Sequence, residues 1–466
     1  MGGQGRSLGS QVLVFAAAAI YLGWGVWNVP LASGYTDPVR QVRPQDEALY
    51  SSISIGMAER SEWLTPRFLG RLAFVKPIGA FLPTAIAVRL FGDSLWSLRL
   101  FAVLCGAAVL TLLFRWQGPA AMLLLAANPL FFLLARRNMT DVPVLCAVLL
   151  TVYLWRKSEK GAGAALAWGI LTKSVAGAVP ALFLFRRWWR IIAVAALLVA
   201  PWHLYQLAEN REWYWNEHIL DEHLQWGVHT PENAAAEPHA VFYGTRAWAW
   251  DPLLTAMAPL AFGYCCYRKR YTEAAWLAAS VLVLFAFGYR NATYLLPIFA
   301  ATAAAAGERV HVALAGGVIG LRLLTGAISH APAEAVSPAA ALAAYTPELR
   351  SRQGLMIDGV ADEFVATTMH LPRVQYLLPG DARTLAATNI DFPRREIIAN
   401  ASAYRGAPEP KETVLLLRDA QDLQTLLDRS ECDFLLPAHR LRELNTQGRR
   451  TLPERNGWVI VLKRDG

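Results

Sequence analysis

Repeated apolar stretches, each long enough to cross a membrane, constrain this chain more than any other feature. A membrane-spanning helix needs about 20 mainly apolar residues, and an excess of lysine and arginine marks its cytoplasmic end. Of the 466 residues, 55% are hydrophobic and only 17% are charged. Because these proportions are too apolar for an ordinary soluble globule, we expect a polytopic α-helical membrane protein surrounded by membrane lipids.

The formal net charge of +8 would suggest a nucleic-acid partner if the protein were soluble. In a membrane protein, basic residues in the loops instead set the orientation of the helices. The 17 tryptophans also fit a membrane protein, because amphipathic rings favour the headgroup layers. We therefore expect no nucleic-acid partner.

Basic clusters placed on the cytoplasmic side predict about eleven transmembrane helices. The interrupted stretch 162–185 counts as two short helices that meet at an outer turn holding Lys173. The segment 76–92 is expected to be interfacial or re-entrant, because a further span there would invert every later basic loop. The predicted spans lie near 12–30, 96–114, 118–135, 141–155, 162–185, 191–207, 247–264, 273–289, 293–306 and 309–327.

The composition changes near Ser329, where the long apolar runs stop. We expect a transmembrane domain over 1–328, with extracytoplasmic loops near 31–95 and 208–246. Residues 329–466 are expected to form a soluble extracytoplasmic α/β domain. Within it, the runs Thr413–Leu417 and Trp458–Leu462 predict strands, and residues 420–430 have helical spacing.

Ionisable residues gather on the outer side of this arrangement. Charges at membrane depth are costly and usually line a polar cavity, so their clustering predicts an outward-facing site at the bilayer boundary. The set comprises Asp46, Glu47, Lys76, Asp141, Lys173, Arg290 and the His/Glu-rich stretch 217–223.

Two adjacent carboxylates, Asp46 and Glu47, open the outer segment. Neighbouring residues on a helix are about 100° apart, so the two side chains cannot point the same way. The simplest interpretation is a helix start, where acidic groups complement the helix dipole. Alternatively, one carboxylate enters the cavity while the other pairs or stays in water.

Motifs between Arg43 and about residue 300 occur in an order that resembles a known family. They are Asp46-Glu47, Tyr50, Met57, Trp63-Leu64-Thr65-Pro66, Lys76-Pro77, Phe91-Gly92, Arg99-Leu100, Arg137-Asn138-Met139-Thr140-Asp141, Leu171-Thr172-Lys173, Pro201-Trp202, Glu222-His223-Leu224 and Arg290 through Tyr294-Leu295-Leu296-Pro297. This pattern resembles the GT-C superfamily of membrane glycosyltransferases. The branch is the one that contains bacterial aminoarabinose transferases acting on lipid A, with protein O-mannosyltransferases as more distant relatives.

The resemblance implies an inverting transfer of sugar from a polyprenyl-phosphate-linked donor. The acceptor would be a lipid, glycan or protein at the outer face of the inner membrane. Asp46 matches the general-base position, and Glu47 would be its partner, tuning the site or binding acceptor or metal.

The resemblance also assigns residues to the donor phosphate and the acceptor. Lys76, Lys173 and Arg290 would contact the phosphate, although Lys76 alone fits a snorkelling anchor and Arg290 a helix cap equally well. Tyr50, Tyr294 and Asp141 would hold the acceptor or serve the structure. For Asp141, an ion pair with Lys173 or Arg137 is the structural alternative.

The stretch 215–226 raises the question of a metal. His218 and Glu222 share one face if the stretch is an α-helix, and such a pair can bind a divalent cation. The alternative is a helix lying wet at the interface. The resemblance singles out Glu222 and His223, so we treat a divalent metal there as possible and expect no other cofactor.

Two other functional classes share part of this pattern. A lipid or sugar transporter or flippase would also have many spans and broken helices. A non-catalytic glycan-binding or assembly protein would rely on the C-terminal domain. The one-sided acidic segment favours catalysis over both.

Overall fold

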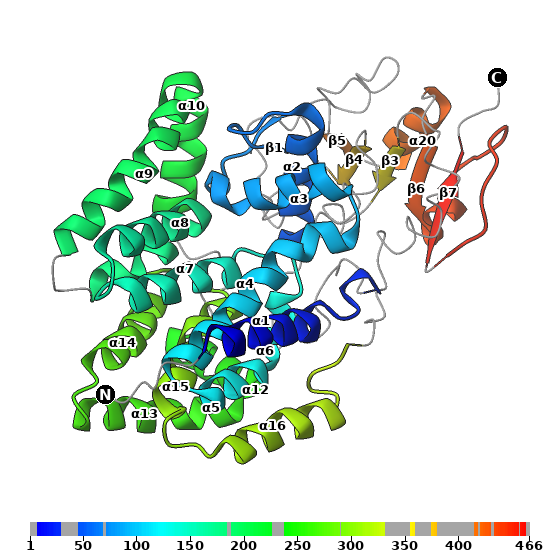
Figure 1. The fold of residues 1–466 in the computed structure, drawn as a ribbon. Helices are drawn as coiled ribbons and strands as arrows, with labels where there is room; N and C mark the ends of the chain where they lie inside the picture. The colour runs from blue at the N-terminus through cyan, green and yellow to red at the C-terminus, as the bar shows by residue number, and fades with distance from the viewer. Residues whose placement is uncertain are drawn as a thin grey trace.

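Helices dominate the computed structural model up to residue 330, and a β-sheet lies beyond it (Figure 1). The structure describes residues 7–28, 45–68, 71–183, 188–225, 237–288, 290–330, 355–358, 374–379, 414–417, 420–429, 433–455 and 457–462.

The described helices differ in length, and α4, α8 and α9 are the longest of them, with 20 to 22 residues each. The α-helices are α1 (Leu8–Gly23), α2 (Gln45–Arg60), α3 (Leu82–Phe91), α4 (Leu95–Trp116), α5 (Pro119–Ala126), α6 (Pro129–Ala135), α7 (Asp141–Leu154), α8 (Glu159–Ala178), α9 (Trp188–Glu209), α10 (Arg211–Tyr214), α12 (His239–Trp250), α13 (Pro252–Tyr267), α14 (Tyr271–Ala286), α15 (Leu296–Ala306) and α16 (Val312–Leu324). Short 3-10 turns are η1 (Val26–Asn28), η2 (Ile78–Ala80), η3 (Val179–Leu182) and η6 (Ala292–Leu295), and η4 (Trp215–Gln225) is a π-helix.

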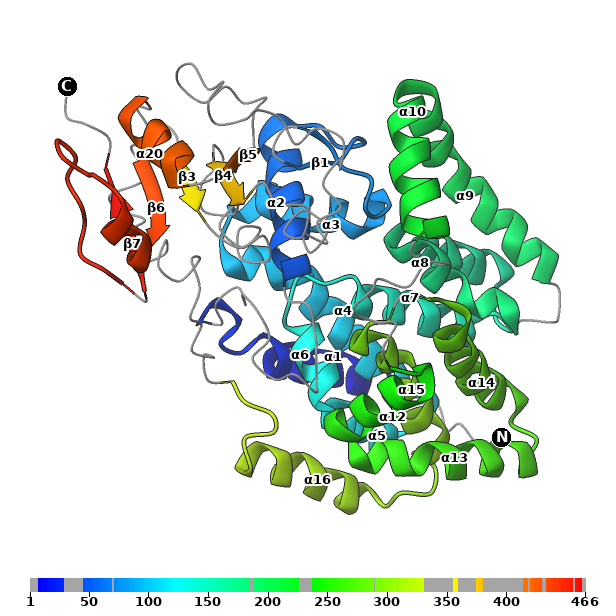
Figure 2. The same cartoon turned by 180° about the vertical axis from the view of Figure 1, so that it is seen from behind.

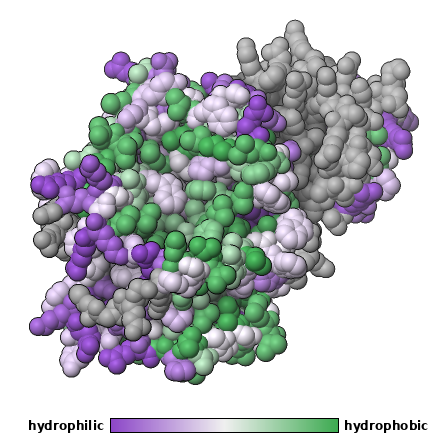
Figure 3. All heavy atoms as spheres, viewed as in Figure 1, coloured by the Kyte–Doolittle hydropathy of each residue, from purple (hydrophilic) through white to green (hydrophobic). Residues whose placement is uncertain are grey.

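Among the described residues, three helical segments are long and apolar enough to cross a membrane: α4, α8 continued through η3, and α9. The outward faces of the helical body are apolar, with Leu197, Leu260, Leu282 and Leu314 more than half exposed on α9, α13, α14 and α16. Hydrophobic side chains cover much of this body in Figure 3. Such a surface fits lipid as its surroundings, because soluble monomers rarely expose large apolar patches. The chain is thus a helical membrane protein.

The predicted span 118–135 is wrong as a single helix, because the chain breaks at Asn128 into α5 and α6. The Asn128 side chain accepts from the backbone amide of Phe131, and Pro129 follows at the first helical position. The predicted span 247–264 breaks in the same way, where Asp251 caps α13 and Pro252 follows. A capping residue before proline starts a new helix, since the missing proline amide needs no partner there.

The two breaks meet inside the protein. The side-chain amide of Asn128 donates a hydrogen bond to Asp251 at 2.7 Å. The guanidinium of Arg322 in α16 donates to both carboxylate oxygens of Asp251, at 2.7 and 2.8 Å. Arg322 also donates to the backbone carbonyl of Ala127 at 2.7 Å. This buried ion pair satisfies the polar groups that each helix break exposes.

The segment 76–92 forms η2 and the ten-residue α3, which is shorter than a span. Several predicted spans are equally short, so the interfacial or re-entrant position of this segment stays a prediction.

The predicted interruption at Lys173 is confirmed. Lys173 and Ser174 have non-helical backbone angles inside α8, and Ser174 has a positive φ of 41°. The chain folds back here, so Gly169 before the break and Gly177 after it lie against each other. A Cβ on Gly169 would come within 3.1 Å of the Gly177 carbonyl oxygen, and one on Gly177 would overlap the Gly169 backbone. Only two glycines allow this approach.

Beyond residue 330, the described strands form one sheet in the order β5-β4-β3-β6-β7. The pairs β3–β4, β3–β6 and β4–β5 are parallel, and β6–β7 is antiparallel. The elements are β3 (Leu355–Asp358), β4 (Val374–Pro379), β5 (Val414–Leu417), α20 (Ala420–Arg429), β6 (Asp433–Pro437), η8 (Ala438–Glu443) and β7 (Trp458–Val461). A two-residue hairpin, β1 (Arg67–Phe68) with β2 (Arg71–Leu72), follows α2.

Alternating residues of β6 and β7 face two different cores. Phe434 and Val459 pack with α20, whereas Leu435 and Ile460 belong to the buried cluster that contains Tyr50 of α2. Both views in Figures 1 and 2 place this sheet beside α2 and α3. Since strand side chains alternate between faces, the sheet packs against α2 and α3 with one face and against α20 with the other.

We expect Gly177→Ala to destabilise the protein, because a methyl group there overlaps the backbone of Gly169. Overpacking of this kind costs about 1–3 kcal/mol. Gly263→Ala in α13 is the matched control, since no atom lies within 4 Å of its Cβ position. Thermal unfolding of the purified protein in detergent checks the pair, and equal melting temperatures would contradict the glycine contact.

Candidate functional site

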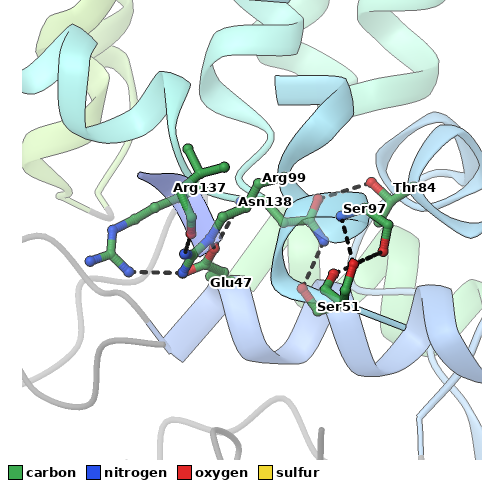
Figure 4. Close-up of polar contacts among 9 residues, drawn as sticks. Glu47, Ser51, Thr84, Ser97, Arg99, Arg137 and Asn138 are labelled. Atoms are coloured by element: carbon green, nitrogen blue, oxygen red, sulfur yellow. Dashed lines mark hydrogen bonds and ion pairs between the residues drawn. The ribbon is translucent and has the colours of Figure 1, made fainter. Parts of the chain in front are cut away.

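The carboxylate of Glu47 is buried in the first turn of α2 (Figure 4). One oxygen, Oε1, accepts from Arg99 Nε at 2.6 Å and from the Asn138 backbone amide at 3.1 Å. The other, Oε2, accepts from Arg99 Nη2 at 3.0 Å and from Arg137 Nη1 at 2.8 Å. Both carboxylate oxygens of Glu47 therefore accept hydrogen bonds from groups inside the protein.

Hydrogen bonds extend from this ion pair into the neighbouring elements. The Asn138 side chain donates to Ser51 Oγ at 2.9 Å and accepts from Thr84 Oγ1 at 3.0 Å (Figure 4). Arg99 Nη1 donates to the carbonyl of Val26 at 2.6 Å. The residues around Glu47 thus join η1, α2, α3, α4 and the segment before α7.

The charge state of Glu47 follows from these partners. Burial alone would raise the pKa of its carboxyl, but the charges of Arg99 and Arg137 and the Asn138 amide together lower that pKa. The group is therefore ionised at neutral pH. Glu47 turns inward while Asp46 influences Tyr50 on another face of α2, as the 100° offset between neighbours requires.

Tyr50 marks the centre of the site. It is buried one turn after Asp46, with its ring 5.8 Å from that of Phe81. Burial raises the pKa of its phenol well above 10, and the nearby Asp46, Glu222, Asp141 and Tyr294 raise it further. Carboxylates from α2, α7 and η4 therefore act electrostatically on one neutral hydroxyl.

Two lysines complete this group of charges. Lys76 Nζ contacts Glu222 Oε2 at 2.7 Å and the Val75 carbonyl at 2.7 Å. Lys173 Nζ contacts Asp141 Oδ1 at 2.6 Å and lies 5.2 Å from the centre of the Tyr294 ring. For Asp141, the structure selects Lys173 from the two predicted ion-pair partners.

Close backbone packing brings the two lysine segments together. A Cβ on Gly79 would lie 2.7 Å from the Leu171 carbonyl oxygen and 3.2 Å from the Thr172 nitrogen. The turn η2, which follows Lys76 and Pro77, therefore rests directly on the chain that leads to Lys173. Ile78 is buried in this turn.

Arg290 lies apart from these contacts. Its Nη1 donates to the backbone carbonyl of Glu237, whose carboxylate pairs with Arg246 at 2.7 Å. The structure brings every other predicted phosphate and acceptor residue to the neighbourhood of Tyr50.

The stretch 215–225 is a π-helix and not the α-helix expected there. Two histidines five apart meet on it: His223 Nδ1 contacts the His218 carbonyl at 2.5 Å, and the two rings are 4.7 Å apart. Burial, helped by His223, lowers the pKa of His218 to about 3. His218 Nδ1 contacts the Phe74 carbonyl at 2.8 Å, while Glu217 accepts from the Phe74 amide at 2.8 Å.

These contacts leave Glu222 and His223 poorly suited to a metal. Glu222 is paired with Lys76, and His223 is turned toward the His218 carbonyl. In the part of the chain that the structure describes, no three His, Cys, Asp or Glu side chains gather closely enough to hold a metal ion.

Arg99, Arg137 and Asn138 are motif residues in the sequence, but only Arg137 had an expected role there, as an ion-pair partner of Asp141. A signal was present for both arginines, because a cation beside a long apolar run needs a buried partner. Their shared partner, Glu47, was not predictable, since it lies 52 and 90 positions away in the chain.

Comparison with known proteins agrees with this arrangement. Residues 75–202 match the family described as dolichyl-phosphate-mannose-protein mannosyltransferase. An undecaprenyl phosphate-alpha-4-amino-4-deoxy-L-arabinose arabinosyl transferase of Pseudomonas aeruginosa is 27% identical over 304 residues, which cover 54% of this chain and 52% of that protein. The corresponding transferase of Aeromonas hydrophila is 28% identical, covering 59% and 58%. The chain spans about half the length of these relatives.

Solved structures extend the similarity to the whole fold. The crystal structure of ArnT from Cupriavidus metallidurans bound to undecaprenyl phosphate superposes with a TM-score of 0.68, at 17% identity, over 98% of both chains. Its apo state gives 0.66, at 16% identity over the same shares. The chain has the GT-C fold. The resemblance to membrane glycosyltransferases of the aminoarabinose transferase branch is confirmed.

We expect Glu47→Gln to destabilise the GT-C fold by about 3–5 kcal/mol at neutral pH, because it leaves two buried guanidinium groups without their anion. The lowered pKa of Glu47 means that its stabilisation is present above the ordinary glutamate pKa of about 4.3 and is lost as the pH falls below it. Thermal unfolding between pH 3 and pH 7 should therefore show a weaker acid dependence in the variant.

Glu62→Gln provides the matched control. Glu62 pairs with Arg67 at 2.7 Å, but both side chains are about one-third exposed, so the loss should stay below about 1 kcal/mol. Equal stability of the Glu47 and Glu62 variants at neutral pH would contradict the role of the buried ion pair.

Proposed function

We propose that the protein is an inverting glycosyltransferase that moves a sugar from a polyprenyl-phosphate-linked donor to an acceptor hydroxyl. The observation that carries this proposal is the convergence of Lys76 and Lys173 with Asp46 around Tyr50. Phosphate-binding cations and a candidate base are the two kinds of group that this reaction needs in one place.

The lysines serve the leaving group. As the bond between the anomeric carbon and the phosphate oxygen breaks, negative charge grows on the phosphate. Ammonium groups held by buried turns stabilise that charge with charge-assisted hydrogen bonds. Lys76 and Lys173 are 13–19% exposed, which leaves them accessible from the site. Arg290 stays a prediction for a further phosphate contact.

Asp46 serves the acceptor as the general base. The acceptor oxygen forms a bond to the anomeric carbon, its proton passes to Asp46, and the electron pair of the breaking bond leaves on the phosphate. Attack opposite the leaving group inverts the anomeric centre. Glu47 supports this step as a positioning residue, because its ion pair fixes the helical turn that carries Asp46.

Three further residues face the acceptor side of this arrangement. Tyr50, kept neutral by its raised pKa, can donate a hydrogen bond to an acceptor oxygen. Asp141 and Tyr294 flank Lys173 and would orient the acceptor or the lysine. The acceptor class, whether lipid, glycan or protein, depends on surfaces that these residues do not define.

Similarity to proteins that act on undecaprenyl-phosphate sugars supports the donor class. Similarity to these membrane proteins also fits a place in the inner membrane. From the basic loops, we propose about eleven transmembrane helices and an active site on the extracytoplasmic side. In this arrangement, residues 329–466 form an extracytoplasmic α/β domain that covers α2 and α3.

Asp46→Asn tests the catalytic role. We expect it to lower turnover about 100-fold or more, because general-base catalysis contributes about 10²–10⁴-fold. Binding of undecaprenyl phosphate should change little, since the lysines remain. The measurement is release of polyprenyl phosphate from a labelled donor by the purified full-length protein.

Asp93→Asn, an exposed change between α3 and α4, is the matched control. Near-normal turnover by a folded Asp46→Asn protein would remove Asp46 as the base. Movement of the intact donor across a vesicle without cleavage would instead identify a transporter.

Lys76→Gln and Lys173→Gln test the phosphate site. Each should weaken the binding of undecaprenyl phosphate by about tenfold or more, the equivalent of one hydrogen bond between charged groups. Lys160→Gln, in an exposed part of the first turn of α8, controls for the general loss of a positive charge. Unchanged affinity in both site variants would exclude these lysines from the donor site.

A further inference from the structure

The ammonium group of Lys76 already has an anionic partner in this structure. Glu222 Oε2 lies 2.7 Å from its Nζ, and the two side chains are 19% and 15% exposed. An anion that enters the site from solvent or membrane therefore reaches an ion pair that is already formed but incompletely buried.

The charges near Tyr50 determine what happens to this ion pair when an anionic donor binds. Three carboxylates, Asp46, Asp141 and Glu222, act on Tyr50, while Lys76 and Lys173 each hold one of the last two. A donor phosphate adds at least one more negative charge. Lys76 Nζ uses two of its three N–H donors on Glu222 and on the Val75 carbonyl, so a phosphate oxygen can approach the third. The nearby Glu222 carboxylate repels that phosphate, so the two anions compete for Lys76.

Asp141 is the less suitable group to withdraw. It is 6% exposed and lies in the first turn of α7, where the helix dipole favours a negative charge. Its short side chain also limits its movement. Glu222 has one more methylene and is more exposed.

Glu222 also belongs to a segment whose helical geometry is unusual, and a change of that geometry would move its side chain. The π-helix η4 runs for 11 residues, whereas π geometry usually persists for a single turn. Return of its last turn to α geometry would rotate Glu222 relative to Lys76. The contact between His223 and the carbonyl of His218, five residues earlier, holds that turn in its π form.

We propose that Glu222 is a competing anion that determines donor affinity: it holds Lys76 while the donor site is empty and gives way to the donor phosphate. This inference rests on the proposed glycosyltransferase function and adds a residue that sets how tightly donor and product are held. After transfer, Glu222 regains Lys76 and helps to displace the polyprenyl phosphate.

The competition predicts a direction that simple positioning does not. If Glu222 only oriented Lys76, its loss would weaken phosphate binding. If it competes, Glu222→Gln keeps the size of the side chain, removes the rival charge and tightens binding. We expect about tenfold higher affinity for undecaprenyl phosphate. Donor KM should fall, and kcat should fall with it where product release limits turnover.

The experiment measures equilibrium binding of radiolabelled undecaprenyl phosphate to the full-length protein in detergent. Wild type, Glu222→Gln and Lys76→Gln are compared, and Glu62→Gln is the matched control because its ion pair with Arg67 lies outside the site. Size-exclusion profiles establish that each variant is folded. If Glu222→Gln does not fold, Glu222→Asp replaces it, and its shorter side chain should tighten binding by a smaller factor.

Tighter binding by Glu222→Gln, with Glu62→Gln unchanged, supports the competition. Equal or weaker binding by Glu222→Gln, while Lys76→Gln also binds weakly, overturns the competition and leaves the proposed function intact. If the wild type does not bind undecaprenyl phosphate, or if Lys76→Gln binds it as tightly as the wild type does, the phosphate site itself is overturned and the competition with it.

Discussion

The segment that carries Asp46 depends on one enclosed carboxylate, that of Glu47. Glu47 meets two guanidinium groups and a backbone amide, and these partners come from α4 and from the segment before α7. Removing an anion from water in this way is costly, and only the full set of partners compensates for it. The same contacts fix the first turn of α2. Asp46, the neighbouring residue, is therefore held in place by an interaction in which it takes no part.

Helix breaks place the remaining groups. The glycine contact within α8 allows the chain to turn at Lys173, and Gly79 lets the turn after Lys76 lie on the same segment. A second pair of breaks, at Asn128 and Asp251, is joined by Arg322 in the helical body. In both regions, polar backbone exposed by a broken helix is buried against protein, as a membrane environment requires.

Much of the site was predictable because membrane-depth charges are rare. An apolar chain with few ionisable residues makes each of them informative, so Asp46, Lys76, Asp141 and Lys173 stood out before any contact was known. Local signals also predicted the break at Lys173. The breaks at Asn128 and Asp251 carried an equally local signal, a capping residue followed by proline, which was overlooked within long apolar runs. The π-helix had no such signal, because its hydrogen bonds depend on packing around Phe74.

The sequence by itself determined that the chain forms membrane helices and which charged residues gather near the outer segment, because apolar run length and charge placement are local properties. Only the tertiary structure decided which carboxylate faces inward and which cation each acid holds. Those choices depend on segments far apart in the chain: Lys76 and Glu222 are 146 residues apart, and Glu47 and Arg137 are 90 apart. Burial decides the strength of each pair, and burial arises only when the helices pack.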